Sequence, residues 1–124
     1  LVSAIDRDLV PTFKGEMVHD VWRVWEWLKE PARLPIQRLF FEVYIARLQA
    51  SASSQSFTGM LAAEADDFWV RFFEERFPVL ADADHVQATT LLAQLRGLQL
   101  DFLASRDATR TDGALRTFLR GLAK

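Results

Sequence analysis

The side chains that could do acid–base, nucleophilic or metal chemistry are few, and they are not spaced for it. Neither His19 nor His85 is followed by a second metal ligand three or four residues later. The adjacent acids 66–67 and 74–75 point in different directions on a helix, so neither forms a general acid/base pair. The Ser-rich residues 51–56 have no nearby His or Gly pattern of a nucleophile. We therefore predict no catalytic residue, no metal site, no cofactor and no enzymatic activity.

Binding of an apolar molecule is the chemistry that the composition favours instead. The 124 residues include ten Phe and four Trp. Flat side chains fill space poorly against one another, and pockets between bundle helices are common. The predicted ligand-binding residues are inward-facing aromatic side chains of three helices and part of a fourth helix: Trp22, Trp25, Phe40, Tyr44, Phe68, Trp69, Phe72, Leu91, Gln94, Leu95 and Leu98. The alternative is a well-packed aromatic core without a cavity.

The expected ligand is small, neutral and mostly apolar. A charged ligand needs a buried counter-charge, and only Glu42, Glu64 and Asp101 are placed to supply one, each near an edge. Residues 51–56 are the expected gate because they are polar and weakly packed. The polar ends of Tyr44 and the tryptophans need partners when they are buried, and polar side chains such as Gln94 or Glu42 are candidates to supply them.

Only helices are predicted to position these side chains, because no strand alternation longer than chance occurs. The expected fold is all-α, with five main helices and a partial one at the N-terminus. The predicted helices cover residues 1–9, 14–29, 35–49, 58–77, 86–104 and a last segment after residue 107. Asp82 or Asp84 is expected to cap the fifth of these, and Asp107 or Thr109 the last. The 35–49 helix is apolar on nearly every side, so we expect it to be deeply buried. Trp27 lies among charged positions, so we expect it to be the least buried tryptophan within a monomer. The alternative is that it rests on the Arg33–Pro35 loop or on a partner chain.

The helix of residues 86–104 has two apolar faces, whereas an ordinary surface helix has one. Large side chains form one stripe: Ala88, Leu91, Leu95, Leu98 and Phe102. The opposite face carries mostly small ones, which would let another backbone approach closely. Together with the apolar stripe of the last helix it forms the predicted homodimer interface: Val86, Ala93, Gly97, Leu100, Ala104, Leu115, Phe118, Leu119 and Leu122. The alternative is that both faces pack within one chain.

Composition narrows the possible partners. The formal net charge is −2 and no basic stripe stands out, so the chain has no expected nucleic-acid surface. It has no Cys, which excludes a disulfide scaffold and fits the reducing cytoplasm. No apolar run reaches the ~18–20 residues of a membrane span, and no signal peptide is recognisable. The chain begins in mid-pattern at Leu1 without Met, which is typical of a piece of a longer protein.

Two stretches resemble the C-terminal regulatory domain of TetR-family transcriptional regulators. They are RLFFEVYIARLQ at 38–49, following WEWLKEPARLP, and LLAQLRGLQLDFLASRDATRTDGALRTFL at 91–119. The resemblance implies an all-α domain in which the last two helices pair with those of a second subunit, while the earlier helices enclose a ligand. It extends over residues 1–124, expected to be a single regulatory domain. The family's N-terminal helix-turn-helix head has no counterpart here, so DNA binding would require that head.

Two functions from different classes follow from these features. The first is an effector-sensing and dimerisation domain of a repressor, with a small apolar or aromatic effector. The second is a constitutive helical dimerisation or protein-interaction module without a physiological ligand. An enzyme or a carrier of hydrophobic molecules is a weaker third interpretation. A cavity lined by the aromatic side chains would favour the first function over the second.

Overall fold

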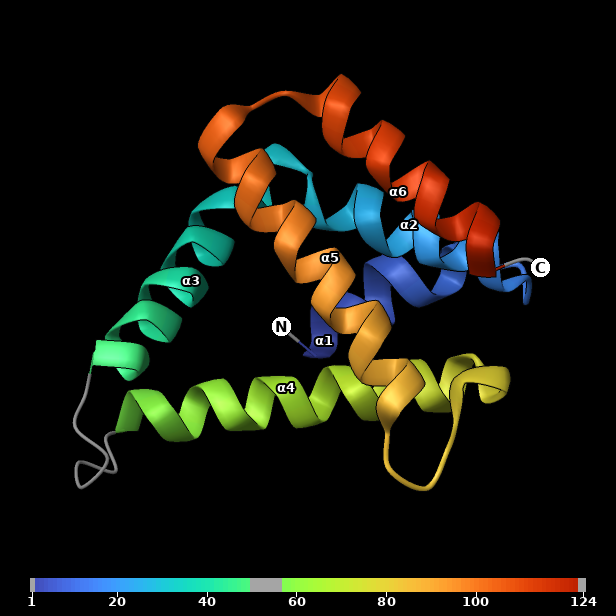
Figure 1. The fold of residues 1–124 in the computed structure, drawn as a ribbon, viewed down its shortest axis with the longest axis horizontal. Coiled ribbons are helices and arrows are strands. Elements are labelled where there is room, and N and C mark those ends of the chain that lie inside the picture. The colour runs from blue at the N-terminus through green and yellow to red at the C-terminus, as the bar shows by residue number, and fades with distance from the viewer. Residues whose placement is uncertain (1, 50–56, 123–124) are drawn as a thin grey trace. The chain divides into compact units, whose positions relative to one another are not determined.

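A computed structural model describes the backbone of residues 2–49 and 57–122, and the side chains of residues 3–49 and 64–122. All regular structure in these ranges is helical, and the all-α prediction is confirmed (Figure 1). The long helices are α2 (Met17–Leu28), α3 (Leu34–Gln49), α4 (Phe57–Arg76), α5 (Val86–Ser105) and α6 (Ala108–Leu122). Among the described residues, no helix combines the length and apolar character needed to cross a membrane.

Shorter helical segments precede and connect these five. The described chain begins with α1 (Val2–Ala4), a π-helical segment η1 (Ile5–Leu9) and the 3-10 turn η2 (Val10–Thr12). We call residues 2–16, which precede α2, the entry segment. Two further 3-10 turns, η3 (Pro31–Arg33) and η4 (Pro78–Leu80), precede α3 and follow α4. The prediction of five main helices with a partial first one is therefore confirmed. The predicted gate at residues 51–56 lies outside the described residues.

The chain gathers into two compact units. Unit 1 comprises Leu1–Arg33 and Leu95–Lys124, and unit 2 comprises Leu34–Gln94. Helix α5 belongs to both, with its first half in unit 2 and its second half in unit 1. That the chain acts as a single regulatory domain stays a prediction.

Unit 1 is built on the entry segment, α2 and α6. Glu16 starts α2 by accepting hydrogen bonds from the backbone N–H groups of Val18 (3.1 Å) and His19 (2.8 Å). Its buried apolar side chains come from the entry segment and three helices: Ile5, Leu9, Val21, Val24, Trp25, Trp27, Leu28, Leu95, Leu115 and Leu119. Each removes a large apolar surface from water, worth roughly 1.5–3 kcal/mol gross for a Leu, Ile or Val side chain.

Unit 2 pairs α3 with α4, and here one expectation was wrong. Helix α3 buries Leu34 and Phe41 well, but Leu48 is 79% exposed. Three further apolar side chains of α3 are at least half exposed: Ile36, Leu39 and Ile45. An all-round apolar helix can bury only the sides that meet a neighbour, and within its unit α3 packs chiefly against α4. Apolar composition therefore overstated the burial of this helix.

Candidate functional site

Helix α5 has the two faces that its sequence predicts. The stripe of large side chains is buried at Ala88, Leu91 and Leu95 and half-buried towards the C-terminal end. The opposite face is open, since Val86 is 59% and Leu100 49% exposed. The small residues of this face are exposed as well: Ala93, Gly97 and Ala104. We call these five outward-facing residues the α5 outer face.

Hydrogen bonds made by side chains of neighbouring segments stabilise both ends of α5. Asp82 accepts hydrogen bonds from the N–H groups of Val86 (2.8 Å) and Gln87 (3.1 Å), so Asp82 is the cap, as one of the two predicted alternatives. At the other end Asp107 caps α6 through the N–H of Arg110 at 3.1 Å. The guanidinium of Arg110 also reaches Asp101 of α5 with two 2.6 Å contacts. Its hydrogen bond holds the pKa of Asp101 below the ordinary value.

The aromatic residues predicted to bind ligand divide between the two units. In unit 2, Phe68, Trp69 and Phe72 pack ring against ring along α4, with centroid separations of 5.5 to 5.9 Å. On α3 the rings of Phe40 and Tyr44 lie 5.4 Å apart. Most of these rings are half-buried. Two other phenylalanines, Phe73 and Phe77, are buried, and they were not among the predicted ligand-binding residues. The structure thus brings the predicted aromatic residues of each helix together within unit 2.

The hydroxyl of Tyr44 has a different partner from those expected. It donates a hydrogen bond to the Asp66 carboxylate on α4. Neither Gln94 nor Glu42, the predicted partners, makes this contact. The two helices run next to each other in unit 2, so an acid on α4 meets a phenol on α3. No local sequence pattern indicated this pairing.

In unit 1, the two predicted tryptophans face α6. Trp25 is fully buried, and its indole Nε1 donates to Asp112 at 2.8 Å. Lys29 donates to the same carboxylate oxygen at 2.6 Å. The guanidinium of Arg116 lies 5.0 Å from the ring centre of Trp22. The polar end of Trp25 is therefore engaged in holding α2 against α6.

Trp27 is buried, and the prediction that it is the least buried tryptophan was wrong. It is only 2% exposed, whereas Trp22 and Trp69 are half-buried. The guanidinium carbon of Arg33 lies 4.1 Å from the centre of its ring and covers it. The side of α2 that was expected to face solvent is also covered at Asp20, which is buried under the preceding loop. Trp27 is thus shielded by Arg33 of the segment that follows α2, the alternative that the sequence left open.

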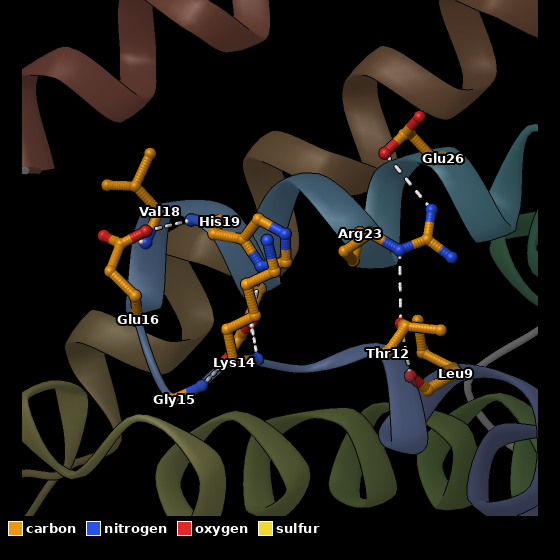
Figure 2. A network of polar contacts seen from close by, with 10 residues as sticks. Leu9, Thr12, Lys14, Gly15, Glu16, Val18, His19, Arg23 and Glu26 are labelled. Atoms are coloured by element: carbon orange, nitrogen blue, oxygen red, sulfur yellow. Dashed lines mark hydrogen bonds and ion pairs between the residues drawn. The ribbon is translucent and has the colours of Figure 1, made fainter.

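Asp20 organises a polar network between the entry segment and α2 (Figure 2). Its carboxylate accepts hydrogen bonds from the N–H groups of Lys14 (2.8 Å) and Gly15 (2.9 Å) and contacts His19 Nδ1 at 2.9 Å. Gly15 adopts a φ of 80°, which favours glycine. Further along α2, Arg23 donates to the Thr12 hydroxyl at 3.1 Å. Burial acts to raise the pKa of Asp20, but the hydrogen bonds from His19, Lys14 and Gly15 outweigh it and lower the pKa.

We expect Asp20→Asn to lower the free energy of unfolding at neutral pH by about 1–3 kcal/mol, because an amide cannot accept from both backbone donors. The folded-state pKa is below the unfolded value, so this stabilisation is present above about pH 4 and is lost as the pH falls through the folded pKa. Urea titrations at neutral and acidic pH measure both effects, with Glu26→Gln on the same helix as the control. Equal stabilities of the Asn variant and the control would contradict this role.

His85 joins α4 to the start of α5 in unit 2. Its Nδ1 lies 2.9 Å from both carboxylate oxygens of Glu74. Its backbone has a φ of 58°, an uncommon conformation for a residue with a side chain. The hydrogen bond with Glu74 raises the pKa of His85, aided by the charges of Glu74, Asp82 and Asp84.

Protonated His85 is therefore expected to stabilise the fold. Its contribution is full below the ordinary pKa of 6.5 and is lost as the pH rises through the higher folded-state pKa. Thermal unfolding midpoints between about pH 6 and pH 9 should fall over this window. His85→Asn should remove the trend while tolerating the left-handed backbone, and Glu74→Gln should remove it too. A trend that persists in both variants would exclude this pair as its source.

The predicted dimer residues of α6 need a correction. Leu115 and Leu119 are buried within the chain itself, so they do not offer surface to a partner. Phe118 and Leu122 are half-buried. The amphipathic stripe of α6 packs into the core of unit 1 because it is the helix's single apolar face. Among the predicted dimer residues, the exposed ones therefore lie on the α5 outer face.

Sequence reasoning did not single out two residues that the structure makes prominent: Asp20 and Asp112. For Asp20 a signal existed, since its helical position lies beside Val24 on the apolar side of α2. Asp112 pairs with Trp25 across 87 residues, which no local pattern reveals. In the described part of the chain, no group of three or more His, Cys, Asp or Glu side chains is gathered to hold a metal ion.

Comparisons with known proteins give no match to this chain, whether with protein-family models, curated proteins or solved structures. The resemblance of residues 38–49 and 91–119 to TetR-family regulators therefore stays a prediction.

Proposed function

We propose that the chain is the effector-sensing and dimerisation domain of a cytoplasmic transcriptional repressor of the TetR family. In this proposal it forms a homodimer, binds a small and mostly apolar effector, and controls DNA binding by a separate N-terminal head. Three observations support the proposal: the motifs at 38–49 and 91–119, the all-α fold, and the α5 outer face.

The single observation that carries the proposal is the exposure of the α5 outer face. Val86, at its N-terminal end, and Leu100, nearer its C-terminal end, place large apolar side chains in solvent. Between them, a Cβ atom built on Gly97 would meet nothing within 4 Å, so this part of the face is open. The small residues let two helices approach closely, while Val86 and Leu100 supply apolar surface to bury. A second copy of the chain presents the same face, which suits an isologous interface.

Helix α6 contributes differently from the sequence-based expectation. With Leu115 and Leu119 committed to the core of unit 1, its exposed residues include Ala114, Thr117 and Gly121. These are also small side chains. The proposed interface is therefore centred on α5, with the small outer residues of α6 beside it and Phe118 and Leu122 at its margin.

The aromatic side chains of unit 2 support the effector-sensing part. Phe68 and Trp69 are half-buried, and their rings adjoin Phe72 and Phe73. Half-buried rings offer apolar surface and ring faces to a flat molecule. By linkage, an effector changes the DNA-binding state only by as much as its affinities for the two states differ.

The unmutated chain is expected to be a dimer at a protein concentration of tens of micromolar. This corresponds to a free energy of dimer dissociation of roughly 8 kcal/mol or more. Sedimentation velocity over a concentration series measures this directly. A monomer over the whole series would refute the proposed function and its alternative together.

A thermal-shift screen with small aromatic compounds then separates the two candidate functions. Binding to the native state raises the unfolding midpoint by an amount that grows with the ratio of the ligand concentration to the dissociation constant. A dimer that no aromatic compound stabilises would favour the constitutive dimerisation module. That alternative is favoured by the same α5 outer face and needs no ligand.

A further inference from the structure

Helix α3 carries a second apolar face that is largely open to solvent. Two of its side chains are more than half exposed, one valine is half-buried and one alanine is exposed: Ile36, Leu39, Val43 and Ala46. They follow one another at intervals of three, four and three residues, so they form one stripe along the helix. We call these four residues the α3 seam. Contiguous apolar patches on a protein surface commonly mark an interaction site.

The packing of α3 within unit 2 leaves this seam uncovered. Helix α3 meets α4 with the side that carries the buried Phe41 and Tyr44, whose hydroxyl donates to Asp66 of α4. At 100° per residue, the centre of the α3 seam lies roughly 150° around the helix from these two side chains. Contact with α4 therefore cannot cover the seam.

The α3 seam has the spacing of a two-stranded coiled coil. Written as a heptad abcdefg, Ile36 and Val43 occupy a positions, and Leu39 and Ala46 occupy d positions. β-Branched residues at a together with leucine at d favour two parallel helices over three or four. The residue types of the seam thus suit pairing with one other helix that carries the same pattern.

The charges beside the seam favour an identical helix in parallel orientation. Glu42 occupies a g position and Arg47 the next e position, and both side chains are exposed. Neither forms an ion pair with another residue in the described part of the chain. In a parallel pair, each g residue lies beside the following e residue of the other helix, so Glu42 meets the partner's Arg47. In an antiparallel pair, g meets g and e meets e, which would place like charges together.

We propose that α3 pairs in parallel with the α3 helix of a second copy of this chain, through the α3 seam and two flanking ion pairs between Glu42 and Arg47. The two heptads of residues 36–49 are about 21 Å long at 1.5 Å per residue. One helix of this length offers a smaller surface than the roughly 800 Å² per partner of a standard interface. We therefore expect a weak contact, with a dissociation constant on the order of hundreds of micromolar.

This pairing does not rest on the proposed function, because the α3 seam and the α5 outer face share no residue. At tens of micromolar the α3 pairing is mostly dissociated, so a substitution within the α3 seam leaves association through the α5 outer face unchanged. Gly97→Trp blocks the α5 outer face alone. In that variant, the α3 pairing becomes a simple monomer–dimer equilibrium, whether or not the α5 contact exists. Failure of either proposal therefore leaves the other intact.

Charge reversal in the Gly97→Trp chain tests the partner and the orientation together. Sedimentation equilibrium up to about 1 mM protein measures the dissociation constant. Glu42→Arg and Arg47→Glu each place like charges in both flanking pairs, and each should raise this constant about tenfold at low salt. The double reversal restores opposite charges and should associate like the parent chain. An equimolar mixture of the two single variants should do so as well, because each pair then joins an acid to an arginine.

Two glutamine variants of the same helix test the seam itself. Leu39→Gln removes a leucine of the α3 seam that is 59% exposed, whereas Leu48→Gln removes a leucine outside the seam that is 79% exposed. Leu39→Gln should raise the dissociation constant about tenfold or more, and Leu48→Gln should leave it within about twofold. Because both positions are exposed in the monomer, circular dichroism should show the same helix content for both variants.

Three results would overturn the proposed pairing. The first is the absence, up to about 1 mM protein, of any association that survives Gly97→Trp, which would show that a second copy does not occupy the α3 seam. The second is equal weakening by Leu39→Gln and Leu48→Gln, which would mean non-specific adhesion of exposed apolar side chains. The third is a double charge reversal that does not restore association, which would exclude the parallel orientation.

Discussion

Replacing Gly97 by Trp is expected to convert the proposed dimer into monomers while leaving the fold of each monomer intact. Within one chain a side chain at this position enters open space, since an added Cβ meets nothing within 4 Å. In a dimer through the α5 outer face the same indole would stand between two closely packed helices. The substitution occurs twice in a symmetric interface, and overpacking costs typically 1–3 kcal/mol at each site. The dimer dissociation constant should therefore rise by about thirtyfold or more.

Sedimentation velocity measures the dissociation constant, and circular dichroism reports the helix content of the same samples. Ala46→Trp is the matched control, because Ala46 is a small exposed residue on α3, outside the α5 outer face. This control should dimerise like the unmutated chain. An unchanged dissociation constant for Gly97→Trp would place the dimer contact elsewhere, whereas loss of helix content would show that Gly97 is needed within the monomer.

The course of the chain and the faces of α5 could be predicted because they depend on local rules. Apolar periodicity separates Leu91 and Leu95 from Ala93 and Gly97 whatever surrounds the helix. Acidic caps also act locally, and Asp82 and Asp107 hold the N-terminal turns as expected. Each of these features needs only the side chains within a few turns of one helix.

Burial could not be predicted where it depends on neighbours from distant parts of the chain. Leu48 is apolar but exposed, because α3 packs chiefly against one helix within its unit. Trp27 has charged neighbours at helical spacing but is buried, because Arg33 lies over its ring instead of extending into solvent. Apolar content measures what a helix can bury, whereas the positions of its neighbours decide what it does bury.

The candidate site shows the same limit more sharply. The sequence indicated which aromatic side chains need polar partners, but the candidates that it offered, such as Gln94 or Glu42, did not include Asp66, to which Tyr44 donates. Partners on different helices are chosen by the packing of those helices. The dimer residues divide in the same way: the exposure of Gly97 follows from its own helix, whereas the burial of Leu115 follows from contacts made elsewhere in unit 1.

Asp112 offers the strongest test of how unit 1 is held together, because one carboxylate oxygen serves two partners on α2. It accepts from Trp25 Nε1 at 2.8 Å and from Lys29 Nζ at 2.6 Å. The Lys29 and Asp112 side chains are only 18% and 21% exposed, so water replaces the lost contacts poorly. The ammonium also lies 5.3 Å from the ring centre of Trp25 and 5.8 Å from that of Phe102. Removing the carboxylate leaves a buried indole N–H and a largely buried cation unpaired.

Asp112→Ala is therefore expected to lower the free energy of unfolding by about 2–4 kcal/mol at neutral pH. Asp112→Asn should lose about half of this, because the amide oxygen still accepts from Trp25 while the charge that balances Lys29 is gone. Urea titrations measure both variants, with Asp67→Ala as the control, since Asp67 belongs to an exposed ion pair 3.8 Å long and its loss should change little. Equal losses for the two alanine variants would show that Asp112 does not hold α2 and α6 together.

The same carboxylate predicts a dependence on pH. Burial acts to raise the pKa of Asp112, but the hydrogen bonds from Lys29 and Trp25 and the charges of Lys29 and Arg116 lower it. A pKa below the unfolded value means that the stabilisation is present above about pH 4 and is lost as the pH falls through the folded pKa. The stability difference between the unmutated chain and Asp112→Asn should shrink over that acidic range. A difference that stays constant down to about pH 2 would mean that the contribution of Asp112 does not depend on its charge, and that the hydrogen bond to Trp25 alone joins the two helices.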